Sequence, residues 1–150
     1  MEYQDTLYRI AKSRIESEED VCDVVQNTLI SAYKSIVNLR ETKYFKSWLL
    51  KILINKCNDF YSNPEKNNIS LEQLEYDYHL KSDDFSNTYG IDYLIKHLSK
   101  DEQTILTLYY SEGYNEKEIS KILNMNYATV RTKIKRAKEK IALKLEKGEI

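Results

Sequence analysis

The side chains best suited to bind another molecule lie where cations alternate with threonines: Thr129, Arg131, Thr132, Lys135 and Arg136. Arginine can form two parallel hydrogen bonds with the edge of a guanine, and the threonine methyl group can contact the methyl group of thymine. Lysine and arginine also neutralise phosphates, which releases counterions and makes binding dependent on salt. These five residues are therefore candidates for reading a DNA duplex.

Residues 114–141 have the pattern of two helices joined by a tight turn, which would position those side chains. Asn115 is suited to cap the first helix, and Glu118, three residues later, completes a capping box. Asn124 can end that helix because asparagine tolerates a left-handed backbone, and Asn126 can cap the second helix. Apolar residues follow at helical spacing: Ile119, Ile122, Leu123, Val130, Ile134, Ala137 and Ile141. This is the helix-turn-helix pattern, whose second helix enters the major groove of DNA.

The charge of the second helix favours the same interpretation. Residues 131–147 hold eight basic and two acidic residues, a net charge of +6, although the whole chain of 150 residues has a net charge of only −1. Such a charge run is usually only a solvated helix face. The helix-turn-helix pattern just before this charge run favours binding to DNA phosphates instead.

A second set of cations lies on and before a predicted helix over residues 44–61: Lys43, Lys46, Lys51 and Lys56, with Asn55 beside them. Aromatic rings stand among them, and rings interleaved with lysines suit single-stranded DNA, where bases stack and lysines meet phosphates. The alternative is that Phe45 and Trp48 are core residues, and for these two rings it is the better interpretation. For the lysines and Asn55 the pattern leaves both interpretations open.

The rest of the chain predicts further helices. Helical spacing of apolar residues indicates a short helix over residues 5–15, a second one that Ser17 would cap, and another near residues 91–98. Ser99 and Glu102 form a second capping-box pair. Residues 62–90 have a net charge of −4 and weak periodicity, so we interpret them as a linker, with a short helix around residues 71–78. The predicted fold is all-α, with two small helical domains, 1–61 and 91–150, joined by a flexible acidic linker. Each half is near the size at which a core is marginal, so part of its stability is expected from a partner.

Composition narrows the class of protein. Two cysteines and two histidines without ligand spacing predict no metal site. Cys22 and Cys57 are expected in the core, because cysteine often behaves as a small hydrophobic residue. A reduced, cytosolic protein is expected because the sequence has no signal-like or membrane-spanning stretch. A nucleophile–base pair and a glycine-rich phosphate loop are also missing, so neither an enzyme nor a cofactor is expected.

With both halves laid out, the chain resembles bacterial RNA polymerase sigma factors of the extracytoplasmic-function (ECF) type. Region 2 of that family is matched by EEDVCDVVQNTLISAYKSI and by the series Trp48, Leu49, Ile52, Asn55 and Asp59. Region 4 is matched over residues 98–141, with Glu118-Ile119, Thr129-Val130 and Arg136-Ala137. The resemblance covers nearly all of the chain outside the predicted linker, and both halves stand in the family's order.

The resemblance implies roles for three sets of residues. Core RNA polymerase would bind a set on the second helix: Asp23, Gln26, Asn27 and Ile30. The −10 promoter element would be engaged as it melts by Arg40, Lys43, Lys46, Lys51, Asn55 and Lys56. The −35 element would be read as duplex by Thr129, Arg131, Thr132, Lys135 and Arg136. The family also makes an anti-sigma factor an expected partner, and the protein would direct transcription initiation without being an enzyme.

Two other functions remain open from the sequence. A helix-turn-helix transcriptional regulator that does not replace a sigma factor would dimerise and bind a palindromic duplex by itself. An adaptor that holds polymerase without reading promoters would tolerate replacement of Arg131 and Arg136.

Overall fold

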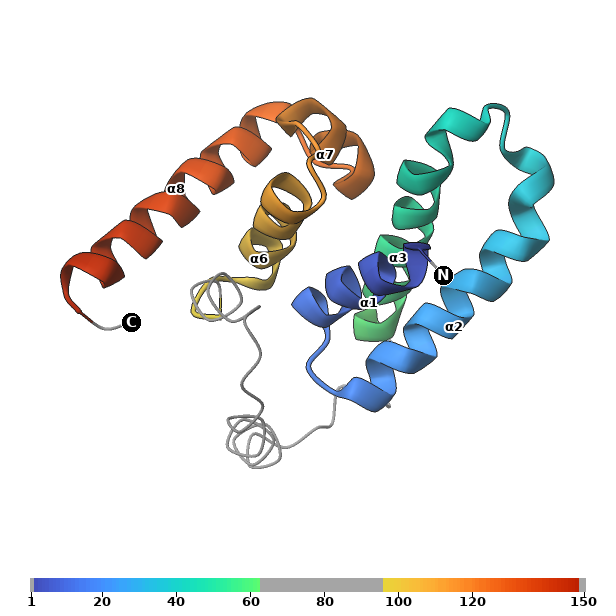
Figure 1. Ribbon diagram of the computed structural model, residues 1–150, viewed down its shortest axis with the longest axis horizontal. Helices are drawn as coiled ribbons and strands as arrows, with labels where there is room; N and C mark the ends of the chain where they lie inside the picture. Colours follow the sequence, from blue (N-terminus) through green and yellow to red (C-terminus); the bar gives the residue numbers. More distant parts are fainter. Residues whose placement is uncertain (1, 63–95, 149–150) are drawn as a thin grey trace.

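The computed structural model describes residues 2–62 and 96–148, and these residues form helices and turns without a strand (Figure 1). The expected all-α class is confirmed. The order of elements is α1 (Glu2–Arg14), α2 (Glu18–Ser35), η1 (Ile36–Asn38), η2 (Thr42–Tyr44), α3 (Phe45–Ser62), α6 (Lys100–Leu106), η3 (Thr107–Ser111), α7 (Glu116–Leu123) and α8 (Tyr127–Glu146). The predicted linker and most of the helix predicted near residues 91–98 lie outside the described residues.

The helices begin where the sequence predicts caps. The side chains of Ser17 and Asn115 each accept a hydrogen bond from the backbone amide three residues later. Ser99 forms the complete capping box with Glu102, whose carboxylate accepts from the Ser99 amide at 3.1 Å. The capping box predicted for Asn115 and Glu118 differs, because Glu118 accepts from the Asn115 side-chain amide rather than from its backbone. Each cap satisfies amides that a helix start leaves without a partner.

The turn between α7 and α8 has the predicted geometry. Asn124 has φ 52°, in the left-handed region, and is the only described residue other than glycine with a positive φ. Asn126 then caps α8 by accepting a hydrogen bond from the amide of Ala128 at 3.2 Å. The two helices are thus joined by three residues, as a helix-turn-helix requires.

The N-terminal half is a bundle of α1, α2 and α3, which pack against one another (Figure 1). Leu7, Val21 and Leu53 are buried within it. The two rings interpreted as core residues, Phe45 and Trp48, are partly buried and pack against the core, whereas Leu50 and Ile54 are fully covered. Apolar residues occupy more than half of the circumference of α3, so periodicity alone does not define which side is covered.

The C-terminal half packs on this bundle. Helix α6 contacts α1, and α7 contacts α3. Ile105, Leu108 and Ile119 are fully buried and belong to the same core cluster as Leu7 and Leu53. In the described residues the two halves therefore share a core, and the domain boundaries at 61 and 91 remain a prediction.

The two cysteines differ in their surroundings. Cys57 is buried in the core as expected, and burial raises the pKa of its thiol to about 11. The expectation for Cys22 was wrong, because it is exposed on α2 beside buried Val21. Within residues 2–62 and 96–148, no helix is long and apolar enough to cross a membrane.

Candidate functional site

The outer face of α8 presents the five residues predicted to read duplex DNA. Val130, Ile134 and Ala137 fix the orientation of the helix because they are buried against α6 and α7. Thr132 and Lys135 lie on the opposite side of the helix, since each residue advances about 100°. The five predicted residues are all exposed: Thr129, Arg131, Thr132, Lys135 and Arg136. The structure therefore brings this set together on one open surface.

Arg131 is oriented by two residues that the sequence analysis did not select. Its Nε lies 3.4 Å from Oε2 of Glu116, at the start of α7. The guanidinium also lies 5.7 Å from the ring centre of Tyr127, whose hydroxyl donates to the same Glu116 oxygen at 3.3 Å. The four-residue spacing of Tyr127 and Arg131 on one helix is the signal that could have indicated this contact.

The cations predicted to bind single-stranded DNA occupy the α2–α3 connection and two sides of α3. Arg40 and Lys43 are exposed in the connection, where Lys43 Nζ lies 3.3 Å from Glu41 and 5.0 Å from the ring centre of Tyr44. Lys51 and Asn55 are exposed one helical turn apart on α3. All four side chains are exposed, so a nucleic-acid strand can reach them.

Lys46 and Lys56 are separated from that set. Both are partly buried. Lys46 and Lys51 lie about 140° apart around α3, because five residues turn a helix by about 500°. The Lys46 amine faces the C-terminal half, where it lies 3.1 Å from the Glu112 carboxylate and 5.8 Å from the ring centre of Tyr114. Burial, with the Glu112 carboxylate adding to its effect, raises the pKa of Tyr114 to about 12.

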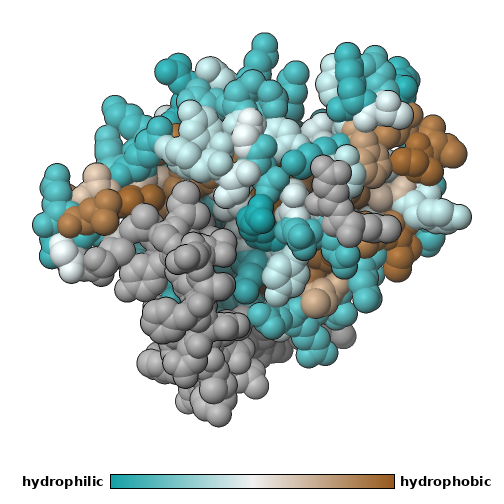
Figure 2. Space-filling view, in the orientation of Figure 1, coloured by the Kyte–Doolittle hydropathy of each residue, from teal (hydrophilic) through white to brown (hydrophobic). Residues whose placement is uncertain are grey.

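The solvent face of α2 holds the four residues predicted to bind polymerase: Asp23, Gln26, Asn27 and Ile30. All four are exposed, and they follow one stripe because they are three or four residues apart. The stripe continues into Tyr33 and Val37, which are 84% and 86% exposed. Figure 2 shows hydrophobic residues at the surface on this side of the molecule. An exposed stripe that ends in apolar residues such as Ile30 and Val37 is typical of a docking surface.

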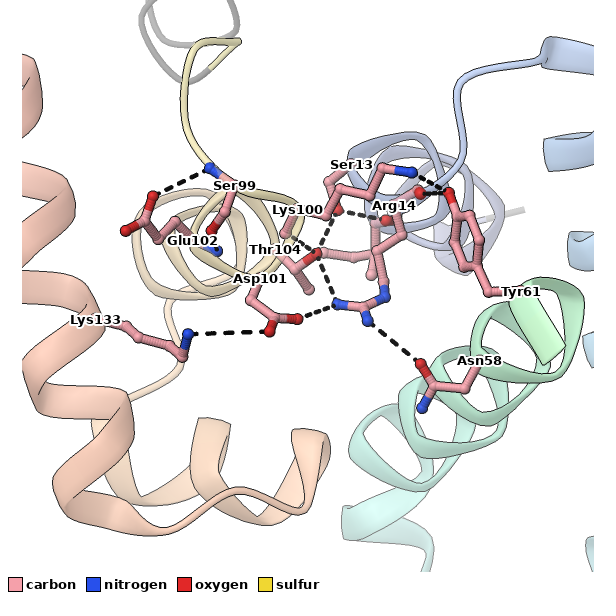
Figure 3. Close-up of polar contacts among 11 residues, drawn as sticks. Ser13, Arg14, Asn58, Tyr61, Ser99, Lys100, Asp101, Glu102, Thr104 and Lys133 are labelled. Atoms are coloured by element: carbon pink, nitrogen blue, oxygen red, sulfur yellow. Dashed lines mark hydrogen bonds and ion pairs between the residues drawn. The ribbon is translucent and has the colours of Figure 1, made fainter. Parts of the chain in front are cut away.

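A polar junction joins the two halves around Arg14 (Figure 3). Its guanidinium donates to Asp101 at 3.1 Å, to Thr104 at 3.4 Å and to Asn58 at 3.3 Å. The Arg14 carbonyl accepts from the Tyr61 hydroxyl, which also contacts Lys100. The Arg14 side chain is 12% exposed, so this one residue of α1 links α3 to α6 largely away from solvent.

A buried carboxylate ties α6 to α8. The Glu102 side chain is 7% exposed, and its two oxygens accept from Lys140 Nζ at 2.9 and 3.1 Å. Burial acts to raise the pKa of Glu102, but the hydrogen bonds from Lys140 and Ser99 outweigh it and lower that pKa. The pair fixes the direction of α8 relative to the capping box at the start of α6.

Among the described residues, no three histidine, cysteine, aspartate or glutamate side chains gather closely enough to hold a metal ion. What the structure offers is three exposed surfaces: a basic one on α8, a second basic one at α3 and the turn before it, and a partly apolar one on α2.

Comparison with known proteins gives matches to both halves. Residues 1–65 match the family described as Sigma-70 region 2, and residues 90–141 match Sigma-70, region 4. The chain is 31% identical to an ECF RNA polymerase sigma-E factor of Haemophilus influenzae over 149 residues, which cover 89% of this chain and 79% of that protein. It is 27% identical to the RNA polymerase sigma factor SigV of Bacillus subtilis over 150 residues, which cover 99% of this chain and 90% of that protein.

Solved structures show the same fold. The sigma factor RpoE of Bartonella quintana, in complex with the anti-sigma factor NepR, aligns with a TM-score of 0.69 at 19% identity. That alignment covers 95% of this chain and 91% of that one. CnrH, in complex with the cytosolic domain of CnrY, aligns with a TM-score of 0.64 at 22% identity and covers 97% of this chain and 83% of that one.

Proposed function

Because this chain belongs to the sigma-70 family, as an alternative sigma factor of the ECF type, we propose that its three exposed surfaces bind core polymerase and the two promoter elements. Sigma factors direct initiation of transcription and are not enzymes, so the catalytic step belongs to the polymerase. The observation that carries the assignment of surfaces is that both matched regions present exposed side chains of the right chemistry on separate helices.

Core polymerase binds the stripe on α2. Asp23, Gln26 and Asn27 supply polar contacts, and Ile30 supplies apolar area because it is 53% exposed. Burying one such side chain contributes about 1.5–3 kcal/mol. We therefore expect Ile30→Glu to weaken binding to core polymerase by at least about tenfold. This can be measured by competition binding without promoter DNA.

Promoter DNA binds two surfaces in two states. The −10 element is bound as a melted strand by α3 and the turn before it, where cations lie near partly exposed rings. The residues assigned to it are Arg40, Lys43, Lys46, Lys51, Asn55 and Lys56. The −35 element is bound as duplex by the N-terminal half of α8, with Thr129, Arg131, Thr132, Lys135 and Arg136 facing the groove.

Run-off transcription with purified core polymerase tests this function. Discrete transcripts are expected from A+T-rich upstream fragments, and they should be lost or strongly reduced with Asn55→Ala or Arg131→Ala. Lys12→Ala is the control, because it removes an exposed cation of α1 outside all three surfaces. If the protein alone binds a palindromic duplex tightly and yields no transcript, the sigma-factor function is refuted in favour of a regulator.

We also propose an anti-sigma partner and a cytoplasmic location. Both solved structures compared above are complexes, one with an anti-sigma factor and one with the cytosolic domain of another protein. A protein that binds both halves would cover surfaces that core polymerase and DNA require. The cytoplasm is where bacterial polymerase and promoters are found.

A further inference from the structure

The carboxylate of Glu112 is buried between the two halves of the chain. Its side chain is 4% exposed, although it follows the short helical turn η3 near the surface. Oε1 accepts from Arg9 at 2.7 Å, and Oε2 lies 3.1 Å from Lys46 Nζ and 3.2 Å from the Thr6 hydroxyl. A carboxylate this buried is stabilised only where such partners replace the water it loses.

The three partners of Glu112 all belong to the N-terminal half. Thr6 and Arg9 project from α1, and Lys46 projects from the first turn of α3. Two cations and a hydroxyl that converge on one anion are the donors that also suit a phosphate. Arg9 and Lys46 keep 46% and 38% of their side chains exposed, so the site stays open to solvent on one side.

We propose that Thr6, Arg9 and Lys46 form a phosphate site for the melted promoter strand, and that Glu112 occupies this site as an internal competitor. The closed form is the observed arrangement, in which α6 and α7 pack on α1 and α3. In the open form the C-terminal half has moved away and a backbone phosphate replaces the carboxylate. This inference rests on the proposed function, since it concerns the surface assigned to the −10 element.

The distance between the promoter elements requires such an opening. The −10 and −35 elements are about 25 base pairs apart, which is about 85 Å along duplex DNA. A compact chain of 150 residues measures only about 40 Å across. The closed form therefore cannot hold both elements at their own surfaces.

The contacts between the halves suit a reversible closure. The Arg9 and Lys46 pairs with Glu112, and the Arg14 pair with Asp101, are charged contacts beside a shared apolar core. One member of each pair is partly exposed, namely Arg9, Lys46 or Asp101, so dissolved ions can reach the pair and salt weakens it. Removal of the carboxylate charge alone should therefore favour the open form without removing the phosphate site.

Binding of a short, labelled, A+T-rich single-stranded oligonucleotide by the full chain tests the proposal. We expect Glu112→Gln to bind at least about tenfold more tightly than the wild-type chain, in keeping with the loss of charged hydrogen bonds that hold the site closed. The dependence of log affinity on log salt should steepen by about 0.7, the value for one added phosphate contact on a single strand. Lys46→Gln in the Glu112→Gln background should remove most of the gain.

Two further variants keep the result decisive. Glu146→Gln removes the same charge from an exposed position on α8 and should change neither the affinity nor the salt slope. Asp101→Asn weakens the closed form away from the phosphate site and should raise the affinity if opening is the cause. The proposal is overturned if folded Glu112→Gln, checked by circular dichroism, binds like the wild-type chain while the wild-type chain supports run-off transcription. Absence of transcription by the wild-type chain would refute the proposed function instead.

Discussion

Replacement of Arg14 by methionine should weaken the contact between the two halves of the chain while keeping most of the apolar volume of that side chain. Arg14 is 12% exposed and donates to Asp101, whereas Asp101 is 39% exposed. A hydrogen bond to a charged group contributes about 1.5–3 kcal/mol when buried, and the exposure of Asp101 reduces this value. We therefore expect Arg14→Met to lower the free energy of unfolding by about 2 kcal/mol, which is about 6 °C in Tm for a chain of this size.

A double-mutant cycle isolates the contact between the halves. Arg14→Met, Asp101→Asn and the double variant, each unfolded in urea, should give a coupling energy of about 1 kcal/mol between α1 and α6. Fluorescence of Trp48, on α3, and helicity from circular dichroism should report the same transition. The corresponding cycle for Lys12 and Glu18, an exposed pair within the N-terminal half, should give less than about 0.5 kcal/mol.

A coupling energy for Arg14 and Asp101 below about 0.3 kcal/mol lies within the ordinary error of additivity. Together with separate transitions for the two probes, it would show that the halves do not pack together in solution. The reasoning on the closed form would then be refuted as well.

Three further predictions concern single sites. Because the pKa of Glu102 is lowered in the folded chain, its pair with Lys140 stabilises the fold above the unfolded pKa near 4.5, and this stabilisation is lost as the pH falls. Glu102→Gln should therefore lower the free energy of unfolding by about 1 kcal/mol at pH 7. In urea unfolding, this variant should also lose less stability than the wild-type chain between pH 7 and pH 3. A thiol reagent such as Ellman's reagent should modify Cys22 rapidly in the folded protein and Cys57 only after unfolding, since Cys57 is buried and its pKa is raised to about 11; equal rates would contradict this. Asn124→Ala should cost about 1 kcal/mol because its φ is 52°, whereas Asn124→Gly should be nearly neutral by the same thermal measurement.

Local features of the fold could be predicted from the sequence because each depends on a few neighbouring residues. The caps at Ser17 and Ser99 and the left-handed turn at Asn124 require only residues within one helical turn. The same holds for the outer face of α8, because its buried stripe fixes which side faces solvent. Helix-scale periodicity was therefore sufficient to predict which side of α8 faces solvent, and this is the side assigned to the −35 element.

The contacts between the halves could not be predicted in this way. Arg14 and Asp101 are 87 residues apart, and Arg9 and Glu112 are 103 residues apart. In the sequence, Glu112 is an ordinary acidic residue before a glycine, and Lys46 is one lysine among several. Only the packing of α6 and α7 shows that Lys46 faces a carboxylate while Lys51 faces solvent.

The shared core also explains how two halves of marginal size are stabilised. Each half has a marginal core by itself, and the chain supplies the missing partner when Ile105 and Ile119 are buried with Leu7 and Leu53 in one cluster. Separation of the halves exposes part of this cluster, so whatever binds the open form must cover that surface again. Core polymerase can favour the open form only by the difference between its affinities for the two forms, and its apparent affinity falls by the fraction of chains that are open. Closure of the chain on itself therefore lowers its apparent affinity for polymerase and promoter DNA, and the charge on Glu112 lowers this affinity further because it favours the closed form.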